Sequence, residues 1–167
     1  MAALEFSNLS ILVFDQNFDR AKLVRELLDN LEVGETFATA SPDAAIKTVI
    51  GNRLSMAVIN LESTNHQAST KQFMDSIRNS QNAHAVGLPI LGMMAEVTKQ
   101  NLMSAVHLGA DFVIQRPFSV NSLKDRISSM LQTPTRHFRS ANYFGPDRRR
   151  MPDDLYGGDK RRADDDG

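Results

Sequence analysis

The segment Gly109-Ala-Asp-Phe-Val-Ile-Gln-Arg-Pro-Phe118 decides the fold of this chain. Its glycine suits the end of a helix, because glycine readily adopts the left-handed conformation of a helix C-cap. Residues 112–114 are β-branched or aromatic, which is typical of a buried strand. Apolar residues then recur at helical spacing at Val120, Leu123, Ile127 and Met130. The segment therefore predicts a helix end, a short buried strand and a final helix in succession.

Apolar runs upstream of this segment predict four more strands. Residues 11–14, 56–59 and 89–94 are short and almost entirely apolar. Runs of this kind are typical of strands that are buried on both faces of a parallel sheet. Residues 36–39 form a less apolar fourth candidate.

Helical patterns fill the intervals between these strands. One apolar helical stripe consists of Leu23, Val24, Leu27, Leu28 and Leu31. Ser41-Pro42 predicts the N-cap and first residue of a helix that reaches about Ile50. A third predicted helix includes Phe73, and a fourth runs from about Thr98 to the Gly109 cap. Five strand–helix units in about 120 residues predict an α/β fold with a doubly wound, five-stranded parallel sheet.

The distribution of charge divides the chain. Residues 136–167 hold eight Arg or Lys and seven Asp, which is 15 of the 39 charged side chains, with little apolar content. Such a composition cannot build a core. We predict a lead-in over residues 1–9, a globular domain over residues 10–132 and a flexible, disordered tail over residues 133–167.

Several classes of protein are excluded by composition. The chain has no cysteine, which excludes disulfides, thiolate metal sites and cysteine nucleophiles. We expect no signal peptide, because no basic segment precedes an apolar run at the N-terminus. No apolar stretch approaches the roughly 18 residues typical of a membrane span, so we expect a cytoplasmic protein without one.

Candidate site residues follow the predicted strands. Ligand sites of parallel α/β sheets lie at the carboxyl ends of the strands. The side chains at these ends belong to Asp15, Gln16, Asn60, Met94 and Arg116.

In order and spacing, these strands and their flanking residues resemble the response-regulator receiver domain of bacterial two-component signalling. The resemblance covers roughly residues 9–132 and rests most on residues 109–118. It implies a flavodoxin-like (βα)5 receiver fold and a cis Arg116–Pro117 peptide bond. In that family, two acids after the first strand help bind Mg²⁺, and an aspartate ending the third strand accepts a phosphoryl group.

Carried over residue by residue, the resemblance implies a degenerate receiver. Asp15 matches the first acid, Gln16 replaces the second, and Asn60 stands at the phosphoacceptor position. Met94 replaces the Thr or Ser that ends the fourth strand, and Arg116 replaces the lysine that ends the fifth. Val113 stands where the family places a switching aromatic residue.

These replacements remove the chemistry of aspartyl phosphorylation. The Asn60 carboxamide is neutral and a poor nucleophile, so we expect no acyl phosphate and no enzymatic activity. Magnesium favours carboxylate oxygens, so we expect no metal or other cofactor, with Mg²⁺ binding weak or absent at Asp15. Arg116 can take the cation position beside Asp15, as a structural salt bridge or as a ligand contact.

The tail contains an internal repeat. Phe144-Gly-Pro-Asp-Arg-Arg-Arg150 recurs twelve residues later as Tyr156-Gly-Gly-Asp-Lys-Arg-Arg162. Two copies predict a bivalent docking element in which an aromatic anchor precedes a cluster that binds acidic or phosphate groups. The residues assigned to partner binding are Phe144, Asp147, Arg148, Arg149, Arg150, Tyr156, Asp159, Lys160, Arg161 and Arg162. A solubility tail with two incidental basic clusters is the alternative interpretation.

Three functions are compatible with these features. We expect a phosphorylation-independent signalling adaptor whose partner is a protein, such as a histidine kinase or another regulator. A homodimer through the fourth and fifth strand–helix units is a further expectation from the resemblance. One alternative is a residual phosphorelay or ligand-binding receiver. A second is a nucleic-acid-associated protein that acts through its tail, which we disfavour because seven aspartates nearly cancel the tail's positive charge.

Overall fold

The structure is a computed structural model that describes residues 4–61, 67–132, 137–139 and 144–146. Its main sheet has five parallel strands in the order β2-β1-β3-β4-β5. The strands are β1 (Ser10–Phe14), β2 (Glu35–Thr39), β3 (Met56–Asn60), β4 (Ile90–Met94) and β5 (Phe112–Gln115). The predicted doubly wound parallel sheet is confirmed, and each strand begins and ends within one residue of its predicted bounds.

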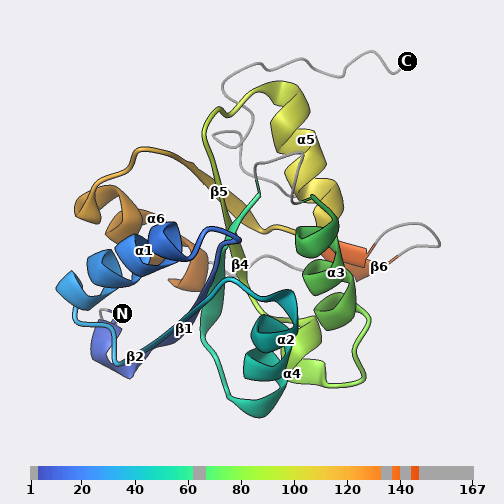
Figure 1. Ribbon diagram of the computed structural model, residues 1–167, viewed down its shortest axis with the longest axis horizontal. Coiled ribbons are helices and arrows are strands. Elements are labelled where there is room, and N and C mark those ends of the chain that lie inside the picture. The colour runs from blue at the N-terminus through green and yellow to red at the C-terminus, as the bar shows by residue number, and fades with distance from the viewer. Residues whose placement is uncertain (1–3, 62–66, 133–136, 140–143, 147–167) are drawn as a thin grey trace.

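Helices cover both faces of the sheet. They are α1 (Phe18–Asn30), α2 (Pro42–Gly51), α3 (Gln67–Arg78), α4 (Ala83–Val86), α5 (Lys99–Leu108) and α6 (Val120–Gln132), after a short 3-10 turn η1 (Phe6–Asn8). Figure 1 shows α1 and α6 on one face and α2, α3 and α5 on the other. Within the described residues, none of these helices has the length and apolar content needed to cross a membrane.

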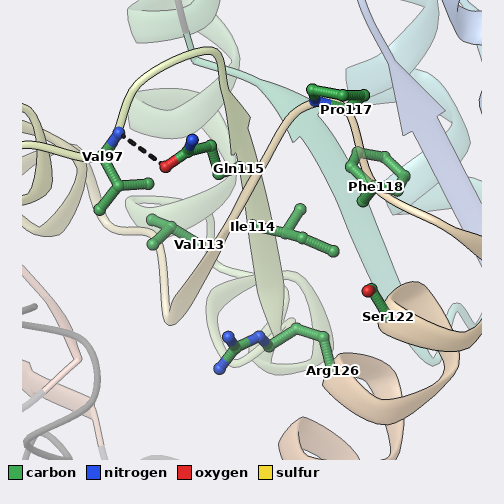
Figure 2. Close-up of a pocket in the computed structure, with 8 residues that line it drawn as sticks. All are labelled: Val97, Val113, Ile114, Gln115, Pro117, Phe118, Ser122 and Arg126. Carbon is green, nitrogen blue, oxygen red and sulfur yellow. Dashed lines mark hydrogen bonds between the residues drawn. The ribbon is translucent and has the colours of Figure 1, made fainter.

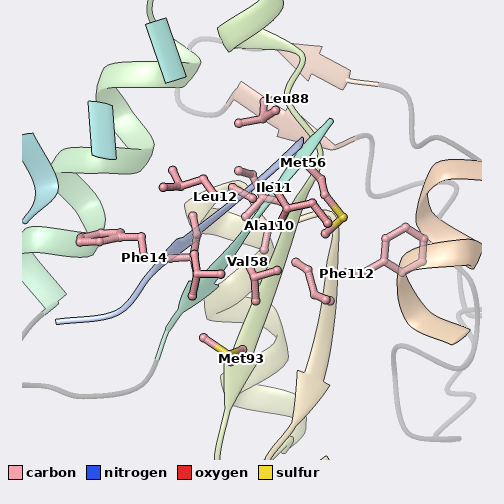
Figure 3. Close-up of a cluster of buried hydrophobic side chains, with 14 of the residues drawn as sticks. Ile11, Leu12, Phe14, Met56, Val58, Leu88, Met93, Ala110 and Phe112 are labelled. Carbon is pink, nitrogen blue, oxygen red and sulfur yellow. The ribbon is translucent and has the colours of Figure 1, made fainter. Parts of the chain in front are cut away.

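The central strands form the core. Every residue of β3 and β4 is buried, as are the last four residues of β1. Figure 3 shows side chains of these strands packed together, with Leu88 at one edge of the cluster and Ala110 within it. The ring of Phe14 lies 5.3 Å from that of Phe73 on α3, centroid to centroid, which joins the sheet to the helical layer.

Local sequence signals define the helix ends. The Ser41 side chain accepts a hydrogen bond from the Ala44 N–H, and Pro42 is the first residue of α2, as predicted. Thr98 caps α5 in the same way. Gly109 ends α5 with a φ of 111°, a left-handed conformation that confirms its predicted role as the C-cap.

Three features differ from the sequence predictions. Leu23 was assigned to the buried stripe of α1 but is 60% exposed, because the buried residues of this helix are Ala21, Val24 and Leu28. The four-residue helix α4 was not anticipated. Within the predicted flexible tail, β6 (His137–Arg139) and β7 (Phe144–Pro146) form an antiparallel pair that no local pattern indicated.

A buried ion pair joins α3, α4 and the turn before β5. Arg78 is 2% exposed and donates to the carbonyls of Val86, Leu88 and Gly109, at 2.7 to 2.8 Å. Its guanidinium also lies 3.3 Å from an Asp111 oxygen, which accepts the Ile90 N–H at 2.7 Å. Burial raises the pKa of Asp111 to about 6, against the opposing effects of the Arg78 charge and the Ile90 N–H.

Gly92 lies in the centre of β4, where a side chain has no room. A Cβ atom at this position would collide with the Leu61 side chain, which packs against the sheet directly after Asn60. The Leu61 N–H also donates to the Met93 carbonyl at 2.9 Å. Gly92 therefore allows the chain to pack closely over the sheet immediately beyond β3.

The collision at Gly92 predicts that Gly92→Ala lowers the free energy of unfolding by about 1–3 kcal/mol, as for other overpacked cores. Gly51→Ala is the matched control, because Gly51 ends α2 with open space around it. This control should be neutral or stabilising by up to about 1 kcal/mol, since alanine favours helix. Urea unfolding of both variants measures the difference, and equal effects would contradict the packing of Leu61 over Gly92.

The raised pKa of Asp111 predicts a specific pH dependence of stability. Between about pH 4 and pH 6 the folded chain holds the Asp111 proton while the unfolded chain releases it. This group's contribution to the free energy of unfolding should therefore fall as pH rises through that window. NMR titration of the Asp111 carboxyl carbon should give a midpoint near 6. A midpoint near the ordinary aspartate value would contradict the dominance of burial over the Arg78 charge.

Candidate functional site

The carboxyl ends of the central strands bring the predicted site residues together. Asp15 follows β1, Asn60 ends β3, Met94 ends β4 and Arg116 follows β5. Parallel pairing of β1 with β3, β3 with β4 and β4 with β5 places all of these ends at one edge of the sheet. The site predicted from strand ends is therefore assembled in the fold.

Asp15 is fully buried and paired with an arginine that the sequence reasoning did not select. Arg20, in the first turn of α1, donates from Nε to Oδ2 and from Nη2 to Oδ1, each at 3.0 Å. The Asp15 Oδ1 atom also accepts the Asn17 N–H at 2.8 Å. This two-pronged ion pair compensates the negative charge of the buried carboxylate. The five-residue spacing of Asp15 and Arg20 across a strand–helix turn is the signal that could have revealed it.

Asn60 is 1% exposed and bonded at both ends of its carboxamide. Its Nδ2 donates to the Gln16 Oε1 atom at 3.2 Å. Its Oδ1 accepts from Nη1 and Nη2 of Arg116, both at 3.1 Å. The expected approach of Arg116 to Asp15 is thus wrong: the carboxylate forms its ion pair with Arg20, and the Arg116 guanidinium lies on Asn60.

Thr70, in the first part of α3, extends this network. Gln16 Nε2 donates to the Thr70 hydroxyl oxygen at 2.8 Å, and that hydroxyl donates to the Asn60 main-chain carbonyl at 3.4 Å. Thr70 is 3% exposed. No pattern in the sequence around Thr70 pointed to it, because its role depends on how α3 packs against the ends of β1 and β3.

The other replaced positions are apolar and buried. Met94 is 5% exposed and Val113 is 6% exposed. The Arg116 N–H donates to the Met94 carbonyl at 2.8 Å, so β4 and β5 stay paired up to the site. The Arg116–Pro117 peptide bond is cis, as the family resemblance implied.

Among the described residues of this pocket, cationic side chains outnumber anionic ones. Among the described residues named above, one carboxylate, Asp15, lies with two guanidinium groups, Arg20 and Arg116, which gives a net charge of +1. Hard cations such as Mg²⁺ favour several carboxylate oxygens. Within the described part of the chain, no three His, Cys, Asp or Glu side chains gather in a way that could hold a metal ion. Glu62 lies outside the described residues.

A separate hollow lies beside β5, at the start of α6. It has a volume of about 260 Å³ and is lined by Val97, Val113, Ile114, Gln115, Pro117, Phe118, Ser122 and Arg126. Figure 2 shows the Gln115 side chain at its rim, where Gln115 Oε1 accepts the Val97 N–H at 3.4 Å. The hollow therefore combines apolar side chains with the polar groups of Gln115, Ser122 and Arg126.

The tail residues assigned to partner binding lie mostly outside the described residues. Residues 147–162, which include both basic clusters, are not described. Phe144 is described through its backbone, as the first residue of β7.

No protein-family model and no curated protein sequence matches this chain. Solved structures do match. The chemotaxis response regulator CheY4 of Vibrio cholerae aligns with a TM-score of 0.63 and 16% identity, over 74% of this chain and 98% of that one. The chain has the receiver fold.

Other matches to the receiver fold agree. The signal receiver domain of a response regulator from Bermanella marisrubri gives a TM-score of 0.59 and 24% identity, over 73% of this chain and 97% of that one. NtrX from Brucella abortus gives 0.63 and 21%, over 75% of this chain but 27% of NtrX. The shared part therefore has the extent of a whole receiver in the first two proteins and of one portion of NtrX.

The charge balance of the pocket predicts how a metal site could be introduced. Gln16→Asp with Asn60→Asp would add two carboxylates beside Asp15, so this variant should bind Mg²⁺ at least about tenfold more tightly than the parent. The matched control is Asn52→Asp with Gln132→Asp, two exposed positions at the opposite end of the sheet. Calorimetric titration with MgCl₂ measures both. Equally tight Mg²⁺ binding by parent and double variant would contradict the pocket described here.

Proposed function

We propose that this protein is a non-enzymatic signalling adaptor that uses its receiver fold to bind other proteins independently of phosphorylation. The observation that carries the proposal is the state of Asn60. Its carboxamide stands at the end of β3, bonded to Gln16 on one side and to Arg116 on the other.

The chemistry of phosphoryl transfer favours this proposal. An acyl phosphate forms when an anionic oxygen attacks phosphorus while a metal and nearby cations neutralise the developing charge. The Asn60 oxygen is neutral and already accepts two hydrogen bonds from Arg116. The neighbouring Asp15 carboxylate is engaged by Arg20. We therefore propose that the pocket uses no Mg²⁺ and has no other cofactor.

The positions that respond to phosphorylation in the receiver family also hold different residues in this chain. Met94 has no hydroxyl group to bond a phosphate, and Val113 is a small buried side chain where the resemblance implies an aromatic ring. The Arg116 guanidinium is fixed on Asn60 in the unmodified chain. We propose that the domain presents one constitutive surface and does not switch between two.

The partner is proposed to be a protein that binds near β5 and α6. The hollow there has apolar walls from Val113, Ile114 and Phe118 and polar groups from Ser122 and Arg126. A histidine kinase, another regulator or a second copy of this chain would each present suitable side chains. The tail repeat, residues 144–150 and 156–162, is proposed as a second contact for an acidic or phosphate-bearing partner.

Intact mass spectrometry after incubation with acetyl phosphate and MgCl₂ tests the central part of this proposal. The expected result is an unchanged mass, because position 60 holds an amide where the family has its nucleophilic carboxylate. A species heavier by about 80 Da, the increment for one phosphoryl group, would overturn it. The Gln16→Asp, Asn60→Asp variant is the matched positive control.

An affinity pull-down with and without acetyl phosphate tests the adaptor role. The same proteins should be recovered in both conditions, since binding is proposed not to depend on phosphorylation. Recovery that requires acetyl phosphate would favour the residual phosphorelay alternative.

A further inference from the structure

Arg20 carries a positive charge at a position where a helix disfavours one. It is the third residue of α1, in the first turn of that helix. The N-terminus of a helix has a partial positive charge, which favours acidic side chains and disfavours basic ones. The preceding residue, Asp19, follows this preference and Arg20 departs from it. The stability of α1 therefore does not explain Arg20, whereas its contact with the buried Asp15 carboxylate does.

The turn between β1 and α1 holds the arginine against this carboxylate. The Asn17 N–H donates to Asp15 Oδ1 at 2.8 Å, and the Arg20 N–H donates to the Asn17 side-chain oxygen at 3.1 Å. The N-cap residue of α1 is thus bonded to the carboxylate on one side and to Arg20 on the other. All of these bonds lie within residues 15–20, so the ion pair and the start of the helix form one local unit.

The ion pair occupies most of the hydrogen-bonding capacity of Asp15. An ionised carboxylate has about four lone-pair positions. The Arg20 guanidinium donates to two of them, from Nε and from Nη2, each at 3.0 Å, and the Asn17 N–H donates to a third. The Asp15 side chain is 0% exposed, whereas the Arg20 side chain is 41% exposed. A cation from solution can therefore bind Asp15 only after protein groups move, and Arg20 makes two of the three bonds.

We propose that Arg20 is a built-in cation, a side-chain charge that compensates Asp15 in place of a metal ion and excludes divalent cations from it. The inference deepens the proposed function and rests on it, because it names the residue that keeps the pocket free of metal. Mg²⁺ requires near-octahedral oxygen coordination and loses its own water reluctantly. It competes poorly for a carboxylate that already accepts three hydrogen bonds. A guanidinium stays charged at every physiological pH and matches both oxygens of a carboxylate.

The source of the compensating charge decides what the pocket depends on. A buried carboxylate without a counter-charge strongly destabilises a fold. A metal ion can supply that charge, but the pocket then depends on the concentration of the metal. Arg20 supplies it from within the chain, so Asp15 is compensated whenever β1 and α1 are folded. Such an arrangement suits an adaptor that presents one constitutive surface.

Manganese titration of the full chain, followed by NMR, tests the role of Arg20. Mn²⁺ takes the same oxygen ligands as Mg²⁺, and its paramagnetism broadens the amide resonances near a weakly bound ion. In Arg20→Ala, the amides of residues 14–18 should broaden at a Mn²⁺ concentration at least about tenfold lower than in the parent, because Asp15 becomes available to the ion. Arg25→Ala is the matched control, since it removes the same charge from an exposed position on α1. It should behave as the parent does.

A second substitution assigns the effect to the carboxylate. Asp15→Asn in the Arg20→Ala chain should abolish the added broadening, because no carboxylate remains at position 15. Equal broadening in the parent, Arg20→Ala and Arg25→Ala would overturn the proposal. Broadening that survives Asp15→Asn would overturn it as well, since the ion would then bind elsewhere.

Thermal unfolding in the presence and absence of millimolar MgCl₂ gives a second measurement. Arg20→Ala leaves a buried charge without its partner, so its Tm should fall further than that of Arg25→Ala. MgCl₂ should raise the Tm of Arg20→Ala, because an ion that binds the folded chain stabilises it, and should leave the Tm of the parent unchanged. Equal responses of the two chains to MgCl₂ would contradict the proposal.

Arg20→Gln keeps the experiment decisive where Arg20→Ala does not fold. The glutamine amide is neutral but can still donate a hydrogen bond to Asp15, so this variant removes the charge with less disturbance. Its Tm should also rise with MgCl₂. An Arg20→Gln chain that responds to MgCl₂ as the parent does would overturn the proposal.

These measurements separate the built-in cation from the proposed function. A phosphorylated species after incubation with acetyl phosphate would refute the adaptor role without altering the comparison between the parent and Arg20→Ala. Equal metal binding by these two chains would refute the role of Arg20 and leave the chemistry of the Asn60 carboxamide as described.

Discussion

The hydrogen bonds from Arg116 to the Asn60 carboxamide are the interaction on which the pocket of this receiver-fold protein depends. They join the ends of β3 and β5, and through Gln16 and Thr70 the same network reaches the end of β1 and the start of α3. Beside it, the buried Asp15 is neutralised by Arg20. Each buried polar group named here has a partner within the protein.

The remainder of the fold positions this network. Parallel pairing of β1, β3, β4 and β5 brings their carboxyl ends to one edge. Because Gly92 has no side chain, Leu61 can pack over β4 directly after Asn60. This contact holds the chain in place where it leaves the pocket. At the opposite end of the sheet, Arg78 ties three carbonyls and Asp111 together, and so anchors α3 to the turn before β5.

The proposed adaptor role places partner binding on the surface of the domain. The hollow beside β5 and the helix α5 both lie on elements near the sheet edge, and β7 reaches α5 from the tail. Protein binding at such a surface needs no covalent chemistry, which fits an amide in place of a carboxylate at position 60.

The sequence by itself determined the α/β class, five strands within one residue of their observed bounds, and the residues at the strand ends. Periodicity and capping depend on near neighbours in the chain, so Pro42, Thr98 and Gly109 could be placed without a fold. The absence of a carboxylate at position 60 was likewise visible, because the sequence itself gives the residue type at each position. Tertiary structure alone decided which groups meet: that Asp15 pairs with Arg20, that Arg116 turns to Asn60, that Thr70 completes the network and that β7 reaches α5. Local patterns on α1 even misplaced Leu23, since the direction of burial follows from the neighbouring elements. The Asn60–Gln16 hydrogen bond joins residues that are 44 positions apart in the sequence, and the Arg116–Asn60 bond joins residues that are 56 positions apart. The packing of the elements brings these residues together, and short-range sequence patterns carry no information about such contacts.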